Sequence, residues 1–300
     1  MRPARLVVGD TVALVAPSGP VPQDLLDAAL PVLRGWGVKV QIGAGVRAEA
    51  VGSYLSAPDA ARAAEFTEAW LDPEVRCVLA ARGGYGAQRM LDLVDWSALR
   101  AAGPKLLAGS SDVTALHRAV HTHLDLATLL SPMPASVLFD QDAAEHLRRT
   151  LFEPDHTRVL RANEPDVLVP GRALGVLVGG NLSLLASGIG AAEQGSARGG
   201  IVLLEDVTES RYRIDRMVTQ LLRSGWFEGV RGVVLGSWAA CGDPDEIREL
   251  MRERLSPLGV PILSGFGFGH VPGSPTLPLG VSASLDTDLA TLTLDAPALD

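Results

Sequence analysis

The sequence contains few cysteines and few aromatic residues, and it has more acidic than basic groups. Among 300 residues there are only two cysteines, Cys77 and Cys241, and there is no CxxC motif. Neither a disulfide framework nor a zinc site is therefore indicated. Twenty-six basic residues face 35 acidic ones, for a formal net charge of −9. This balance disfavours nucleic acid or an anionic membrane as the main partner, because both are bound through clustered Lys and Arg.

Long uninterrupted apolar runs are also missing. The most membrane-like window, residues 173–192, contains five glycines and a central Asn181, so it is better explained as a strand, a turn and a buried helix. The first residues are basic and then apolar, but Asp10 interrupts that stretch, so we expect no secretory signal. With 47% hydrophobic residues the chain is predicted to be a globular, cytoplasmic protein.

The distribution of apolar residues predicts an α/β fold. Apolar runs that are typical of buried strands alternate with helical patterns in the first half of the chain; the runs are 12–17, 38–43, 75–81, 105–109 and 126–130. This alternation predicts βαβ units, with a parallel sheet covered by helices on both faces. Prolines interrupt the pattern over 131–172, which keeps one short helical stretch at 141–152, and the alternation resumes at 173.

Length and pattern together predict two domains. A chain of this length has a prior of about two domains. We expect an N-terminal α/β domain over 1–135, a connecting segment over 136–172 and a C-terminal α/β domain over 173–300.

Several local signals predict where single elements begin and end. Ser56 is the expected N-cap of a helix that runs to Trp70, and Asp243 is the expected cap of another helix. Pro31 lies inside a helical pattern, so that helix is expected to be kinked or to start late. Residues 281–295 alternate in polarity around a central turn and predict a hairpin.

The first stretch that could carry chemistry is residues 105–117. An apolar strand runs into Gly109, Ser110, Ser111 and Asp112 and then directly into a helical pattern. A strand, tight turn and helix with serine at the turn is how a nucleophile elbow exposes its Oγ, and it aims the helix N-terminus at developing negative charge. The match to G-x-S-x-G is partial because no glycine follows. The alternative is that Ser111 or Asp112 only caps the helix.

The second stretch is the sequence Arg-Gly-Gly-Tyr-Gly at residues 82–86, which follows the strand-like run 75–81. Glycines allow backbone N–H groups to approach a ligand closely, as in an oxyanion hole or an anion-binding nest. The stretch matches neither of the common phosphate-loop motifs. An ordinary tight turn between strand and helix explains it equally well.

The third stretch consists of two separated loops. Glu205 and Asp206 lie at the end of the apolar run 201–207, and His270 follows the sequence Gly-Phe-Gly-Phe-Gly. Of the six histidines only His270 lies on a glycine-flanked loop after a strand, where a general base could reach a site. A structural histidine is the alternative. The three stretches supply a nucleophile, an acid and a base in the order found in α/β-hydrolases, which favours serine hydrolysis and leaves their proximity open.

The chain also resembles a known family, the LD-carboxypeptidases among the serine peptidases, which include the microcin C7 immunity proteins. The resemblance covers nearly all 300 residues. It is carried by GDTVALVAPSGPV, ARGGYGAQRMLDLVDW, GSSDVTALH, GGNLSLL, LLEDVTESRYRIDRM and GFGFGHVPGSPTLPLGVSASLD.

The resemblance implies a catalytic triad of Ser111, Glu205 and His270, with the backbone N–H groups of Gly84 and Asp112 as oxyanion donors. It implies a Rossmann-like first domain that carries the nucleophile and a second domain that supplies Glu and His, with the site between them, and it implies a homodimer. Two departures from the family pattern are small. Ser110 stands where an aromatic residue is common, and a changed loop at 208–210 makes Glu209 an alternative to Glu205.

The function that we expect from the resemblance is that of a cytoplasmic serine carboxypeptidase without metal or organic cofactor. It would release the terminal D-Ala of a murein tetrapeptide during wall recycling. One alternative is a microcin-immunity activity that cleaves amides joining a peptide or aminoacyl group to a nucleotide, and another is a catalytically silent peptide-binding protein. Recognition of a nucleotide needs an aromatic stacking platform. Aromatic residues make up only 5% of the chain, and the candidates are Phe266, Phe268 and Trp238. Peptide termini could instead be bound by Arg82 or Arg211.

Overall fold

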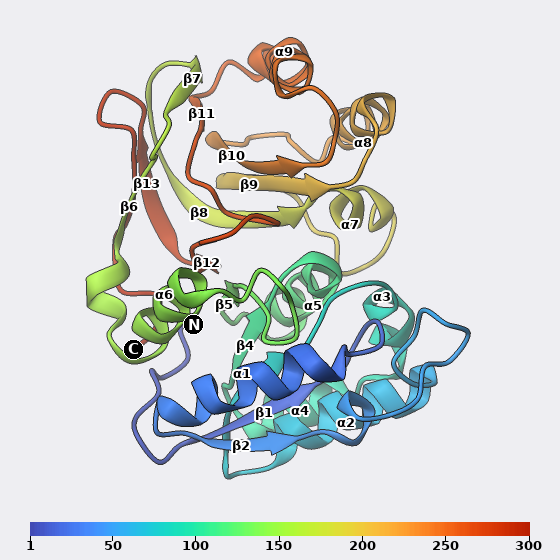
Figure 1. Cartoon of the computed structure of the whole chain (residues 1–300). Helices are drawn as coiled ribbons and strands as arrows, with labels where there is room; N and C mark the ends of the chain where they lie inside the picture. Colours follow the sequence, from blue (N-terminus) through green and yellow to red (C-terminus); the bar gives the residue numbers. More distant parts are fainter.

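Two β-sheets, one above the other, organise the molecule (Figure 1). The computed structural model describes all residues from 1 to 300. The first sheet has six strands in the order β12-β5-β4-β3-β1-β2. Their bounds are β1 Thr11–Val15, β2 Lys39–Ile42, β3 Val75–Ala80, β4 Leu106–Gly109, β5 Thr128–Leu130 and β12 Leu277–Leu279. All neighbours in this sheet are parallel except β12, which pairs antiparallel with β5.

Helices connect the parallel strands of the first sheet. Their bounds are α1 Gln23–Gly35, α2 Asp59–Leu71, α3 Ala87–Met90, α4 Trp96–Ala102 and α5 Thr114–Leu124. Helix α6, Gln141–Phe152, follows β5 and precedes β6 of the second sheet. Short 3₁₀ helices cover Ala44–Val46, Leu91–Leu93, Ser111–Val113, Pro154–Thr157 and Ser256–Leu258. The predicted parallel-strand α/β architecture is confirmed.

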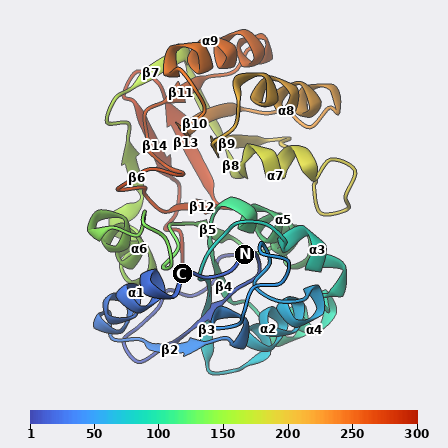
Figure 2. The same ribbon diagram turned by 45° about the vertical axis from the view of Figure 1, so that its right-hand side comes forward.

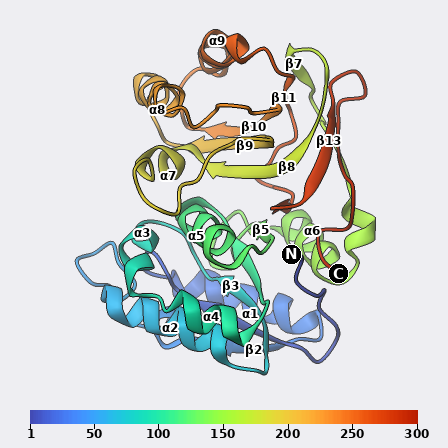
Figure 3. The ribbon, with the colours of Figure 1, turned by 180° about the vertical axis from the view of Figure 1, so that it is seen from behind.

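The second sheet has eight strands in the order β6-β14-β13-β8-β9-β10-β11-β7. Their bounds are β6 Val159–Arg161, β7 Asp166–Val169, β8 Arg172–Asn181, β9 Gly200–Val207, β10 Gly232–Ala239, β11 Ile262–Ser264, β13 Ser282–Asp286 and β14 Thr291–Leu294. The central strands β8 to β11 are parallel, and the outer ones are antiparallel. Helices α7 Leu182–Ser187, α8 Arg211–Arg223 and α9 Pro244–Leu255 lie along one side of this sheet (Figure 3).

The chain crosses between the sheets more than once. Strands β6 and β7 come from the predicted connecting segment 136–172 and join the second sheet, whereas β12 comes from the far C-terminal region and joins the first. The two chain ends lie side by side between the sheets (Figure 2), where Asp300 exchanges backbone hydrogen bonds with Pro3 and Arg5. The domain boundaries at 135 and 172 stay a prediction.

The hydrophobic core joins the two sheets. Its largest cluster, of 37 buried residues, includes Leu14 of β1, Leu147 of α6 and Leu203 of β9. Each fully buried Leu of this kind contributes about 1.5–3 kcal/mol through removal of apolar surface from water. Two further clusters lie under α2 to α5 and under α7 to α9. Because the largest cluster is shared, the relative position of the two sheets is fixed by packing.

Most local predictions hold, and one is wrong. The five early strands, the helix at 141–152, the Asp243 cap and the C-terminal hairpin are all confirmed. Ser56 is not an N-cap, because α2 begins at Asp59 and the Ser56 hydroxyl donates to the carbonyl of Ala16. Of the two alternatives for α1, a late start is excluded, because the helix runs from Gln23 through Pro31 to Gly35; a kink at Pro31 stays a prediction. Burial of its apolar face offsets the hydrogen bond that proline removes.

The membrane-like window forms β8 and α7, as predicted. None of the helices has the length and apolar character that crossing a bilayer requires.

Candidate active site

Ser111 occupies a strained turn at the end of a buried strand. Strand β4 ends at Gly109, and the 3₁₀ turn Ser111–Val113 leads directly into α5. Ser111 has φ +59°, a left-handed conformation that costs a residue with a side chain about 1–2 kcal/mol. Its neighbour Ser110 is extended, with φ −147°. The backbone therefore has the strained strand-turn-helix form of a nucleophile elbow, with Ser111 rather than Ser110 at its apex.

The glycine-rich loop 82–86 approaches Ser111 closely. A Cβ atom on Gly83 would lie 2.9 Å from the Cβ of Ser111 and 3.2 Å from its Oγ. Gly84 and Gly86 have φ of +117° and +129°, which residues with side chains rarely adopt. The loop can therefore hold its backbone against Ser111 only because these positions are glycine.

The Asp112 side chain ties the elbow to this glycine loop. It is 1% exposed and accepts a hydrogen bond of 2.7 Å from the backbone N–H of Ala87. The backbone N–H of Gly86 and the hydroxyl of Ser18 lie nearby, although the Ser18 hydroxyl makes no hydrogen bond. Burial raises the pKa of Asp112, and these donors act in the opposite direction. Sequence reasoning missed this role, because nothing local relates Asp112 to residues 25 positions earlier.

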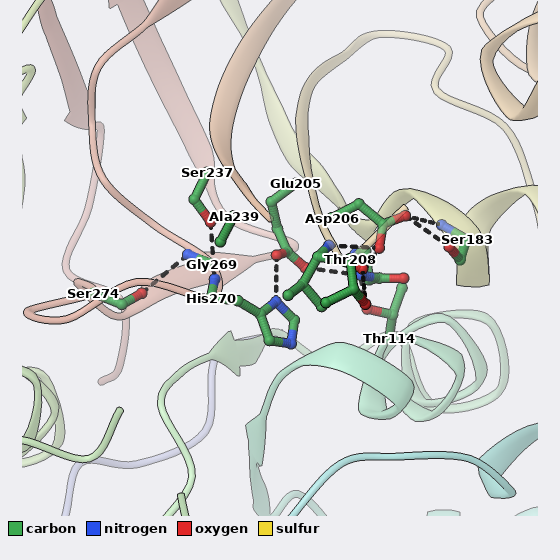
Figure 4. Close-up of polar contacts among 12 residues, drawn as sticks. Thr114, Ser183, Glu205, Asp206, Thr208, Ser237, Ala239, Gly269, His270 and Ser274 are labelled. Atoms are coloured by element: carbon green, nitrogen blue, oxygen red, sulfur yellow. Dashed lines mark hydrogen bonds and ion pairs between the residues drawn. The ribbon is translucent and has the colours of Figure 1, made fainter. Parts of the chain in front are cut away.

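Glu205 and His270 form a hydrogen-bonded pair in the second sheet's half of the molecule (Figure 4). The Glu205 carboxylate, at the end of β9, is fully buried and lies 2.7 Å from Nδ1 of His270. The other ring nitrogen, Nε2, makes no hydrogen bond within the chain. The backbone around His270 is fixed by the hydroxyls of Ser237 and Ser274, which accept from the N–H groups of His270 and Gly269 at 2.9 and 3.0 Å.

This pairing shifts the titration of the imidazole. Burial of His270 acts to lower its pKa, but the hydrogen bond and negative charge of Glu205, with the charge of Asp206, raise the pKa above 6.5. His270 is thus a stronger base than a free histidine. A carboxylate on Nδ1 also favours the tautomer that leaves a lone pair on Nε2.

Asn181 and Asp206 hold the Glu205 carboxylate in place. The Asn181 amide donates to Glu205 at 3.2 Å and to Asp206 at 3.0 Å. Asp206 in turn accepts from the N–H and hydroxyl of Ser183 at 3.0 and 2.7 Å. Asn181 and Asp206 are buried and Ser183 is half-buried, so each hydrogen bond restrains the next. The sequence showed Asn181 only as a residue that follows two glycines at a turn.

A direct link connects the two halves. The backbone N–H of Asn181 donates to Oγ1 of Thr114, the first residue of α5 and three positions after Ser111, at 3.0 Å. Gly180 permits this approach, since a Cβ there would lie 2.6 Å from the same hydroxyl oxygen. The elbow, Asn181, Glu205 and His270 are therefore connected through consecutive contacts at the junction of the sheets.

Other residues singled out from the sequence lie differently. Glu209 lies 3.6 Å from Arg213, whereas the hydrogen bond of His270 is made to Glu205. Phe266 and Phe268 are 3% and 0% exposed, so they offer no surface on which a ring could stack. Arg82 donates to the carbonyl of Pro20, and Arg211 lies 3.5 Å from Glu246.

His117 and the cysteines are buried in the core. His117 bonds the carbonyl of Gly109 at 2.9 Å, and burial lowers its pKa to about 4. Cys77 and Cys241 are both free thiols. The structure contains no group of three or more His, Cys, Asp or Glu side chains that could hold a metal ion.

Comparison with known proteins gives consistent matches over the whole chain. Residues 12–131 match the model of the LD-carboxypeptidase N-terminal domain, and residues 174–285 match that of the C-terminal domain. The "Putative carboxypeptidase" of Streptomyces coelicolor is 54% identical, over 100% of this chain and 97% of that protein.

Two solved structures are similar over nearly their full length. The muramoyltetrapeptide carboxypeptidase of Oxalobacter formigenes has a TM-score of 0.83 and 30% identity, over 96% of this chain and 99% of the other. MccF in complex with glutamyl sulfamoyl guanosine has a TM-score of 0.88 over 100% and 99%. At 23% sequence identity, this structural similarity shows that MccF and this chain share a fold.

Proposed function

The chain belongs to the LD-carboxypeptidase family, and from this premise we propose that it is a serine carboxypeptidase that releases the terminal D-Ala of a murein tetrapeptide. The observation that carries the proposal is the 2.7 Å hydrogen bond between Glu205 and His270, joined through Asn181 and Thr114 to the strained elbow at Ser111. A nucleophile, a base and an acid that orients the base are the parts that covalent serine catalysis needs.

In the first half of the proposed reaction, the Ser111 hydroxyl attacks the carbonyl carbon of the L,D-peptide bond and gives its proton to Nε2 of His270. Glu205 stabilises the imidazolium that forms. The backbone N–H groups of Gly84 and Asp112 donate hydrogen bonds to the carbonyl oxygen and stabilise the negative charge that develops on it. The C–N bond then breaks, and His270 returns the proton to the amine of the leaving D-Ala.

In the second half, water attacks the acyl-enzyme ester. His270 takes one proton from that water, and the second tetrahedral intermediate collapses as the bond to Ser111 Oγ breaks. The proton on His270 restores the serine hydroxyl, and the tripeptide leaves with a new carboxylate. In each half of the reaction, His270 accepts one proton and gives it back.

Murein peptide is favoured over a nucleotide conjugate as substrate. The solved relative named for muramoyltetrapeptide is 30% identical, whereas MccF, at 23%, shares the fold. Within the chain, burial removes Phe266 and Phe268 as stacking surfaces, and Trp238 is only half-buried at the end of β10. Two of the three aromatic residues that the sequence offered for a nucleobase are thus inaccessible.

Two experiments test this function. The first measures kcat/KM on a murein tetrapeptide and on an aminoacyl-sulfamoyl adenosine under identical conditions, and we expect the tetrapeptide to be preferred. A much higher kcat/KM on the adenosine conjugate would reverse the assignment. The second is labelling with a fluorophosphonate probe, because a protein that only binds peptides has an unactivated serine and stays unlabelled.

We further propose that the enzyme is a cytoplasmic homodimer, as the family resemblance implies. Sedimentation equilibrium at micromolar concentration tests the assembly, and a mass of one chain would contradict it. Cell fractionation followed by the carboxypeptidase assay tests the location.

A further inference from the structure

Exposed aromatic side chains are confined to a few positions in this molecule. The chain has five Trp, six Phe and three Tyr. None of the tryptophan or phenylalanine residues is exposed, whereas Tyr54, Tyr85 and Tyr212 are 50%, 50% and 63% exposed. Tyr54 and Tyr85 lie against each other, with ring centroids 5.8 Å apart and planes tilted by 55°. Two of the three exposed aromatic rings thus form a single surface, which we call the tyrosine pair.

The tyrosine pair lies beside the proposed catalytic serine. Tyr85 belongs to the glycine loop, two residues after Gly83, whose backbone approaches Ser111. Three residues after Tyr85, Gln88 contacts Ser187 of α7 at 3.1 Å, so this loop lies at the junction of the two sheets. The turn that carries Tyr54 lies next to α3 at one edge of the first sheet's domain (Figures 1 and 3).

The pair is held ready by a strained turn. Val51 and Leu55 exchange backbone hydrogen bonds of 2.8 and 3.1 Å and close a tight turn around Tyr54. Within the turn, Gly52 and Ser53 have φ of +60° and +65°, and Ser53 adopts this conformation at a cost because it has a side chain. Residues kept in such conformations cluster at binding and active sites, where the strain preorganises a contact. An exposed aromatic residue on such a turn is positioned before any ligand arrives.

We propose that the tyrosine pair binds the sugar ring of a muramoyl-bearing tetrapeptide, and the proposal rests on the function proposed above. The pair is amphipathic: its ring faces suit the C–H groups of a pyranose, and its hydroxyls suit the sugar hydroxyls. Three residues lie between the scissile bond and the sugar, a reach of about 10 Å when extended. Tyr85 follows Gly83 with one residue between them, so its backbone lies at most about 7 Å from that of Gly83, before its side chain extends further.

A nucleobase fits this surface less well. The two rings touch each other at a tilt, so no flat base can insert between them. A nucleotide conjugate also needs a cation for its phosphate or sulfamoyl group. Arg89, beside Tyr54, is already paired with Asp59 at 2.8 Å, and Arg82 is bonded to the carbonyl of Pro20. A neutral sugar needs no cation, so the pairing of these two arginines does not prevent its binding.

The test compares two substrates that differ only in the sugar. D-Ala release is measured from a free tetrapeptide and from the same tetrapeptide with N-acetylmuramic acid on its N-terminus. We expect the ratio of kcat/KM, sugar-bearing over free, to fall five- to tenfold in Tyr54→Ala and Tyr85→Ala, mainly through KM. Tyr54→Phe and Tyr85→Phe keep the ring, so the ratio should fall about twofold. Leu289→Ala, an exposed residue on the turn between β13 and β14, is the control and should leave the ratio unchanged.

The possible results separate the two proposals. If wild-type protein releases D-Ala from neither peptide, the proposed function is wrong and the sugar site falls with it. If both peptides are cleaved but the alanine variants lose activity on each equally, the pair serves the peptide or the glycine loop, and the sugar site is overturned. An unchanged ratio overturns it as well. If the variants selectively lose activity on an aminoacyl-sulfamoyl adenosine, the pair binds a base instead.

Discussion

The two halves of the candidate site are built by different means. On the first sheet, the position of Ser111 depends on backbone: a left-handed φ, a helix that starts directly after it, and glycines that approach to within contact. On the second sheet, the position of His270 depends on side chains, namely Glu205, Asn181 and Ser237. The buried side chains of the first half brace this backbone: Asp112 accepts from Ala87, Arg62 donates to the carbonyl of Gly86, and His117 bonds the carbonyl of Gly109.

This difference predicts different sensitivities to mutation. A backbone-built half tolerates few added atoms, because a methyl group on a glycine meets fixed neighbours. A half built from side chains tolerates few changes of charge or hydrogen-bonding capacity, because each buried polar group depends on the next. Volume should matter most around Ser111, and charge should matter most around His270.

The largest effect is expected from Ser111→Ala. Removing the nucleophile should lower kcat for D-Ala release by about 10⁴-fold or more, and labelling by a fluorophosphonate should disappear. Ser110→Ala is the matched control, since Ser110 is extended and lies outside the apex of the turn; most activity should remain. A dead Ser110→Ala enzyme with an active Ser111→Ala enzyme would reverse the assignment.

Glu205→Gln should have the second largest effect, a loss of kcat of about 10³- to 10⁴-fold, although the side-chain volume hardly changes. It also has a pH signature. The charge of Glu205 raises the pKa of His270, and only neutral His270 can accept the serine proton. The acidic limb of kcat/KM should therefore lie at higher pH in the wild type than in the variant. Glu209→Gln is the control, and a large loss there with an active Glu205→Gln enzyme would exchange the two roles.

Gly83→Ala tests whether added volume damages the backbone-built half. Its methyl group would lie 2.9 Å from the Cβ of Ser111, so the loop or the serine must move. We expect kcat to fall by about 10²- to 10³-fold, as when an oxyanion donor is lost, with the melting temperature little changed. Gly35→Ala, where a methyl group meets no atom within 4 Å, should retain full activity. Equal activity of the two variants would show that the loop is free to adjust.

The smallest effect is expected from Asp112→Asn, which probes a buried carboxylate that braces the first half. The amide keeps a single acceptor oxygen, and its NH₂ group cannot accept from the backbone N–H of Ala87 if it takes the place of Oδ2. The glycine loop should shift slightly, lowering kcat by about tenfold with little change in KM. Asp95→Asn, a remote helix cap that accepts from Ala98, should show no kinetic change. A rise in KM without a fall in kcat would assign Asp112 to substrate binding.

Much of the fold could be predicted because it depends on neighbours in the chain. The apolar runs that became β1, β3 and β4 and the glycine-serine turn after β4 are local patterns, and their form is set by burial and by backbone sterics within a few residues. The Asp243 cap and the C-terminal hairpin were predicted for the same reason. Ser56 was misassigned because its hydroxyl has a buried partner, Ala16, forty positions away.

The sequence by itself determined which segments become strands and helices, which serine lies at a strand end, and which carboxylate and histidine lie on loops beyond strands. Only the tertiary structure decided that β12 returns to the first sheet, that Glu205 rather than Glu209 contacts His270, and that Asn181 links Glu205 to Thr114. Local patterns are dictated by the periodicity of side chains along one element. Contacts between residues 24 to 67 positions apart depend on how two sheets pack around a shared core, and that geometry is not written in any single stretch of the chain.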